Sequence, residues 1–166
     1  MHAKSLARIG YVLEAVKVQV FEVETIGANY VVRSRFLTKT REWILRHTFN
    51  LDVAELSGSE SIIRSVVFSP SDLSRLDEDR ARQNNSVGKE EHTRLSGLLH
   101  TLGSHLDRAE AMTLQISWMH DSVAAEYQFA NGHSESRTFT TARLEQIGSV
   151  SRFGTSTRTR FSSKSS

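Results

Sequence analysis

At 166 residues the chain is long enough to form one domain around its own core, and the absence of cysteine excludes disulfide scaffolds, thiolate catalysis and cysteine-ligated metal sites. The formal net charge is +2, but residues 151–166 carry four cations and no acid, so residues 1–150 have a net charge of −2 (17 Lys and Arg against 19 Asp and Glu). The N-terminal apolar run Ile9–Leu13 is too short for a secretory signal or a membrane span, so we expect a soluble, cytoplasmic body with a flexible basic tail.

Residues 16–68 read as a series of antiparallel strands. Apolar and polar side chains alternate from Val16 to Val23 with one phase slip, which indicates a bulge, and residues 27–29 predict a turn into a strand over 30–36. Residues 43–51 fit either a strand or a short helix, and we favour the strand. Residues 57–60 predict a loop, and the β-branched run over 62–68 predicts another strand.

A helix follows this last strand. In the run Ser69-Pro70-Ser71-Asp72, Ser69 is suited to the N-cap and Pro70 to the first helical position. Asp72, three residues after the N-cap, can complete a capping box. We expect this helix to carry Leu73 and Leu76 inward and to end by residues 83–85. The polar stretch that follows, to residue 89, is the only internal linker candidate.

The second half predicts a helix followed by a three-stranded meander. From 91 to 109 the leucines and Ala109 recur at helical spacing, so one stripe should face a core. From Thr113 the spacing changes to two, and a turn at residues 121–122 would place Trp118 opposite Ala125 and Leu114 opposite Phe129.

The second turn of the meander is expected at Asn131-Gly132, a pair able to adopt positive φ. Two registers are open, and we favour a three-residue loop with a bulge at Gly132 because it places Phe139 opposite Val123, on the apolar face. The opposite face then carries polar side chains for water. Thr140 or Thr141 can cap a short helix that buries Leu144 and Ile147.

The expected fold is therefore α+β, an antiparallel sheet with helices packed on one face, in a single domain over 1–150. The junction at Phe68-Ser69 is matched at Phe139-Thr140, at an offset of 71 in the numbering (139 minus 68), and each is followed by two inward apolar residues. This echo is either a generic feature of strands that enter capped helices, which we favour, or the trace of a duplication giving similar halves at about 9–83 and 90–150.

Common catalytic and cofactor signatures are missing from the sequence. Five of the seven histidines lie between His92 and His133, but those on the predicted helix point in different directions, so we expect no metal site. There is no Gly-x-Ser-x-Gly elbow, no His-Glu-x-x-His and no glycine-rich phosphate loop. We assign no catalytic, cofactor-binding or metal-binding residues.

The most suggestive cluster is cationic. Five cations surround the single acid Glu42 within fourteen residues, and they form our candidate polyanion-binding set: Arg33, Arg35, Lys39, Arg41 and Arg46. A nucleic-acid site usually adds surface aromatics, and Trp43 and Phe36 are equally suited to the core.

Three functions remain open. We favour a non-catalytic binding or accessory protein that acts through a protein partner and away from membranes. The alternative is a nucleic-acid-associated module that uses residues 33–46 and the tail. An enzyme whose site is assembled from distant polar residues is the third. The sequence specifies neither the partner nor the oligomeric state.

Overall fold

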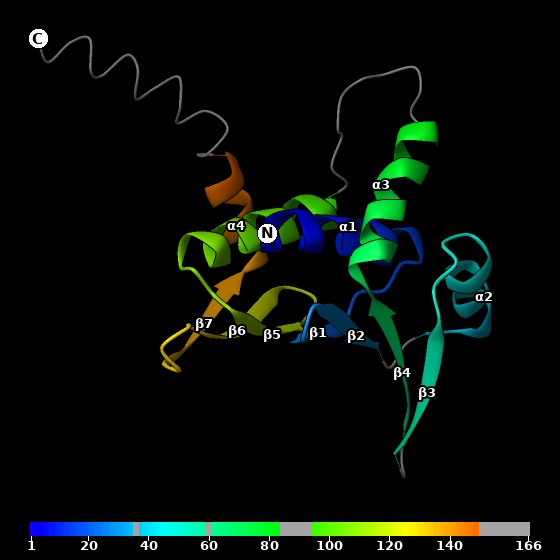
Figure 1. Ribbon diagram of the computed structural model, residues 1–166, viewed down its shortest axis with the longest axis horizontal. Coiled ribbons are helices and arrows are strands. Elements are labelled where there is room, and N and C mark those ends of the chain that lie inside the picture. Colours follow the sequence, from blue (N-terminus) through cyan, green and yellow to red (C-terminus); the bar gives the residue numbers. More distant parts are fainter. Residues whose placement is uncertain (35–36, 59–60, 84–93, 150–166) are drawn as a thin grey trace, which may run out of the picture.

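The computed structural model describes residues 1–34, 37–58, 61–83 and 94–149. Its strands form one seven-stranded antiparallel sheet in the order β3-β4-β2-β1-β5-β6-β7, which confirms the α+β class. The helices α1, α3 and α4 lie over one face of this sheet, and α2 lies at its edge beside β3 (Figure 1). Among these residues no helix is both long and apolar enough to cross a membrane.

The elements have the following bounds. The helices are α1 His2–Ala15, α2 Lys39–His47, α3 Pro70–Gln83, α4 Arg94–Arg108 and a C-terminal helix over 141–149. The strands are β1 Phe21–Ile26, β2 Asn29–Ser34, β3 Val53–Gly58, β4 Ser61–Phe68, β5 Thr113–Trp118, β6 Ser122–Gln128 and β7 Ser134–Thr140.

The core lies between the sheet and the antiparallel pair α1 and α4. The leucine stripe of α4 is buried, with Leu99, Leu102 and Leu106 fully inaccessible, and it packs with the alternating apolar residues of β5 and β6. Trp118 stacks on Phe21 of the neighbouring strand at 5.7 Å between ring centroids. The predicted α4 stripe and the predicted inward faces of β5 and β6 are both confirmed.

Two glycines allow α1 and α4 to approach closely. A Cβ on Gly103 would lie 2.5 Å from the Cα of Ala3, and one on Gly10 would lie 2.9 Å from the Cα of Ser96. The nearest opposing atom at each position belongs to backbone, so a side chain at either position would require the helices to shift. The two helices therefore pack in a geometry that depends on these two positions.

The same order of elements occurs twice along the chain. The central strands β1 and β5 pair with each other, and each is preceded by a helix, α1 before β1 and α4 before β5. Lys17 and Glu110, at an offset of 93 (110 minus 17), both have positive φ, 56° and 57°, and end their helices with equivalent backbone hydrogen bonds. The two-residue turns at 27–28 and 120–121 show the same offset of 93 (120 minus 27).

The two halves differ in the length of chain between one pair of equivalent strand residues. Tyr30 of β2 pairs with Phe68 across an interval of 38 (68 minus 30), whereas Val123 of β6 pairs with Phe139 across an interval of only 16 (139 minus 123). The difference of 22 (38 minus 16) falls between β2 and β4, where α2 and β3 are found. We call this part of the chain the insertion, and we retain a duplication as a proposal for the origin of the two halves.

Both predicted capped junctions are present. The Ser69 Oγ accepts from the Asp72 amide at 3.1 Å while the Asp72 carboxylate accepts from the Ser69 amide at 3.0 Å, which is the predicted capping box. In the second half the Thr140 hydroxyl accepts from the Arg143 amide at 3.1 Å. The bulged hairpin is also confirmed, since Gly132 has a φ of 85° and Phe139 pairs with Val123.

The predicted β5–β6 register is wrong by two positions. The turn lies at 120–121 instead of 121–122, so Trp118 pairs with Val123 and Leu114 with Tyr127. A shift of two leaves every side chain on its original face, because side chains alternate with period two. The predicted inward set is therefore right although the predicted partners are not.

Three assignments in the first half are corrected. The alternation from Val16 belongs to the end of α1 and the following turn, and the strand begins only at Phe21. The preferred strand over 43–51 is wrong. Residues 43–47 belong to helix α2, whose N-cap Thr38 accepts from the Arg41 amide at 3.3 Å, and residues 48–51 follow the helix without forming a strand. The segment predicted as loop 57–60 partly overlaps strand β3, which ends at Gly58.

Candidate functional site

The four candidate cations that the structure describes lie on two different elements. Arg33 is on β2, in the sheet, whereas Lys39, Arg41 and Arg46 are on α2. Arg35 and the basic tail lie outside the described residues. The four described cations therefore come from a strand and from a helix at the edge of the sheet.

Two of these cations form ion pairs with acidic side chains. Glu24 accepts an ion-paired hydrogen bond from Arg33 at 2.7 Å across the β1–β2 ladder. Arg46 donates to Glu42 at 3.3 Å and to the Val53 carbonyl at 2.6 Å, so it ties α2 to β3. The same Glu42 also accepts from Arg64 at 2.9 Å. Much of the positive charge in this region is consequently compensated within the protein.

The solvent-facing side of α2 carries an exposed aromatic. Trp43 is 58 % exposed, and its ring lies 4.7 Å from the ring of His47, one turn later. Lys39 and Arg46 fall on the same helical face, while Leu45 on the opposite face is 1 % exposed. We call Lys39, Thr40, Trp43, Arg46 and His47 the outer face of α2.

Sequence reasoning missed this surface because it read residues 43–51 as a strand. In a strand Trp43, Leu45 and His47 share one side, but in a helix Trp43 and Leu45 point in nearly opposite directions. Thr38, a good N-cap residue before a run with few β-branched residues, was the available helix signal.

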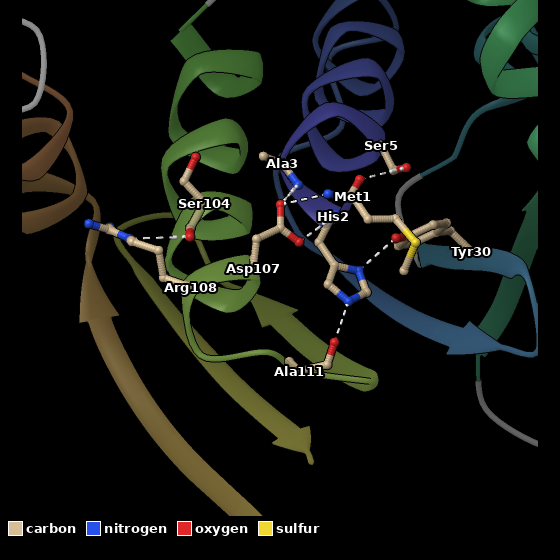
Figure 2. Close-up of polar contacts among 9 residues, drawn as sticks. All are labelled: Met1, His2, Ala3, Ser5, Tyr30, Ser104, Asp107, Arg108 and Ala111. Carbon is tan, nitrogen blue, oxygen red and sulfur yellow. Dashed lines mark hydrogen bonds and ion pairs between the residues drawn. The ribbon is translucent and has the colours of Figure 1, made fainter. Parts of the chain in front are cut away.

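A buried polar network joins the N-terminus of α1 to the end of α4 (Figure 2). The ring of His2 is 2 % exposed and lies 2.7 Å from the Tyr30 hydroxyl and 2.8 Å from the Ala111 carbonyl. The carbonyl can only accept, so the Nε2 of His2 donates to it, and in a neutral ring Nδ1 accepts from Tyr30. Burial raises the pKa of Tyr30, and the charge of Asp107 adds to that rise, which keeps the hydroxyl protonated.

Asp107 caps the first turn of α1 from the neighbouring helix. Its carboxylate accepts from the amides of His2 and Ala3 at 2.8 and 3.0 Å and pairs with the N-terminal ammonium at 2.9 Å. Burial alone would raise the pKa of Asp107, but these donors outweigh it and lower the pKa. With its polar atoms bonded and the ring enclosed, we interpret the His2 network as structural.

The other histidines that the structure describes do not gather into a metal site. Within the described parts of the chain no group of three or more His, Asp or Glu side chains is placed to hold an ion. His105 packs edge-on against Phe139 and Tyr127, and burial, followed by the charges of Arg137 and Arg108, lowers its pKa. His92 lies outside the described residues.

The sheet face away from the helices is open, and one part of it is polar. The β1, β5 and β6 positions on this face include Glu22, Glu24, Gln115 and Glu126. At the β3–β4 end, Leu56 and Val67 are 42 % and 41 % exposed. No aromatic side chain occurs on this face among the described strand residues, so bases have nothing there on which to stack.

Comparison of the chain with protein-family models, with curated proteins and with solved structures finds no match.

Proposed function

We propose that the chain is a cytoplasmic, non-catalytic binding protein that acts through a protein partner docked on the outer face of α2. The observation that carries this proposal is the 58 % exposure of Trp43. Tryptophan and arginine are enriched among the residues that dominate binding energy at protein interfaces. Here both occur on one exposed helical face, with a histidine ring against the indole.

The packing of α2 supports this proposal. Leu45 already anchors the helix to the core, and Arg46 ties it to the Val53 carbonyl, so Trp43 is not needed to hold α2 in place. The helix also belongs to the insertion, which has no counterpart in the second half. A feature that the repeated scaffold does without is a reasonable place for a specific function.

The charge balance favours a protein over a nucleic acid. Phosphate-dominated binding requires several converging cations, because affinity comes from the counterions they release together. Arg33 and Arg46 are already paired with Glu24 and Glu42. An acidic or amphipathic protein segment can instead use one aromatic anchor and a few surrounding charges.

Site-specific photo-crosslinking in cells tests the proposal. We expect a crosslinker at the exposed Thr40 to capture one saturable protein partner, and the capture to disappear in a Trp43→Ala background. The matched control is a crosslinker at Met119, another exposed apolar position at 54 % exposure, which should not capture that protein. Purified partner should bind the Trp43→Ala variant at least about tenfold more weakly, as for other anchor residues. Equal capture from both positions would reject α2 as the docking surface.

Polyanion binding remains the alternative, and the exposure of Trp43 next to cations is the observation in its favour. Salt-dependent retention on heparin distinguishes the two functions. Under our proposal, deletion of 151–166 removes most retention at physiological salt. Tight, salt-sensitive retention of that truncated protein, abolished by Arg33→Glu with Arg35→Glu, would make nucleic-acid association the leading function.

A further inference from the structure

A small groove lies where the two halves meet, remote from α2 along the sheet order. It has a volume of about 250 Å³ and lies between the end of α1, the start of α4, the β5–β6 turn and the start of the C-terminal helix. This volume is just below the usual range of small-molecule pockets, so only a compact ligand would fit here.

The groove has an apolar floor and a largely cationic rim. Val18, Leu98 and Trp118 form the floor and are 2 %, 5 % and 4 % exposed. Lys17, Arg94 and His120 lie on the rim and are exposed. The lining also contains one acid, Glu14, whose carboxylate accepts from the Leu95 amide at 2.9 Å. Arg94 has one ion pair, with Glu145 at 3.0 Å, on the outer surface.

The groove can be compared with the equivalent position at the other end of the helix pair. At the other end of the helix pair, the ring of His2 fills the space between the two halves and bonds to the Ala111 carbonyl. The offset of 93 makes Leu95 the counterpart of His2 (95 minus 2) and Val18 the counterpart of Ala111 (111 minus 18), and both line the groove. The first half thus has the ring of His2 at a position where the second half has Leu95, beside the groove.

We propose that this groove binds a small amphiphilic carboxylate. The apolar body of the ligand lies on Val18, Leu98 and Trp118, which removes apolar surface from water. Its carboxylate lies at the rim, where Lys17, Arg94 and His120 supply donors of hydrogen bonds to an anion. The proposal is independent of the partner on α2, because the two surfaces share none of their residues.

Three ligands with the same body and different heads test the proposal. The chain has two tryptophans, so a full-length Trp43→Phe variant makes the emission of Trp118, on the floor of the groove, the only indole signal. We expect 4-phenylbutyrate to change this emission saturably and to bind at least tenfold more tightly than 4-phenylbutylamine. The neutral 4-phenylbutanol should bind with intermediate affinity.

A matched pair of variants locates the carboxylate. Lys17 and Glu110 have equivalent positions and φ values of 56° and 57°, so replacing either by Gln carries the same backbone cost. In the Trp43→Phe background, Lys17→Gln should weaken 4-phenylbutyrate at least threefold and leave 4-phenylbutanol unchanged, whereas Glu110→Gln should change neither. Unaltered emission of the free variants would show that both are folded.

Any one of three results would overturn the proposal. The first is no saturable change in Trp118 emission up to roughly 10 mM 4-phenylbutyrate, a range that spans weak millimolar binding. The second is equal affinity for the amine and the carboxylate, and the third is equal weakening of 4-phenylbutyrate binding by Lys17→Gln and Glu110→Gln. None of these results bears on the crosslinking at Thr40, so failure here is distinguishable from failure of the proposed function.

Discussion

Replacing Gly103 by Ala tests whether the contact between α1 and α4 sets the stability of the fold. The new Cβ would lie 2.5 Å from the Cα of Ala3 and 2.7 Å from its nitrogen, well inside the 3.4 Å at which ordinary contact begins. Both atoms belong to backbone, so the helices must separate and loosen the packing of Leu99, Leu102 and Leu106. Overpacking of this kind costs about 1–3 kcal/mol.

Helix propensity acts in the opposite direction, since alanine is favoured over glycine in a helix interior by about 1 kcal/mol. We expect the clash to prevail, with a net loss of about 1 kcal/mol that lowers the melting temperature by roughly 2–4 °C. Gly10→Ala should cost less, because its nearest atoms lie at 2.9–3.0 Å and one is the flexible end of Leu99. Ser104→Ala, on the same helix, is the control and should change stability by less than about 0.5 kcal/mol. Urea unfolding measures all three, and a Gly103→Ala variant as stable as the parent would refute the reasoning.

Three further outcomes follow from the core, the caps and a buried histidine. Leu102→Ala should lower the free energy of unfolding by about 2–5 kcal/mol, because the side chain is fully buried; a loss below about 1 kcal/mol would place it outside the core. Ser69→Ala should cost about 1 kcal/mol in urea unfolding, and Thr140→Ala a similar amount; unchanged stability in either would contradict its capping bond. The pKa of His105 is lowered by burial, so its contribution to stability is fully present above its unfolded pKa near 6.5 and is lost as the pH falls from that value through the lower folded pKa. Between about pH 7.5 and pH 5.5 the urea midpoint should therefore fall more in the parent than in His105→Gln, and equal falls would exclude this residue as the cause.

The second half was the more predictable because its local signals agree with its tertiary packing. The α4 stripe, the period-two strands and the Asn131-Gly132 turn each point to one structure, and the packing uses all three. The turn after Trp118 was misplaced by one position since both 120–121 and 121–122 bury the same side chains.

The first half was less predictable because apolar residues of different elements mimic one strand. Leu45 belongs to α2, whereas Phe49 and Leu51 follow it, yet all three alternate with polar residues and all are buried. Spacing alone cannot separate such a pattern from a strand. The exposure of Trp43 depends on that distinction, which is why the candidate surface emerged only from the structure.

Comparison of the two halves separates the features that both share from those that only one has. Helix ends at Lys17 and Glu110, equivalent turns and equivalent caps occur in both halves, so these features are explained by folding alone. Folding does not explain what one half has and the other lacks. The insertion adds a helix that exposes Trp43 although Leu45 already anchors it. The groove is lined by Leu95, at the position where the other half places the ring of His2. These two departures from the repeat are therefore where binding is best sought, and each has a variant that alters it while leaving the shared scaffold in place.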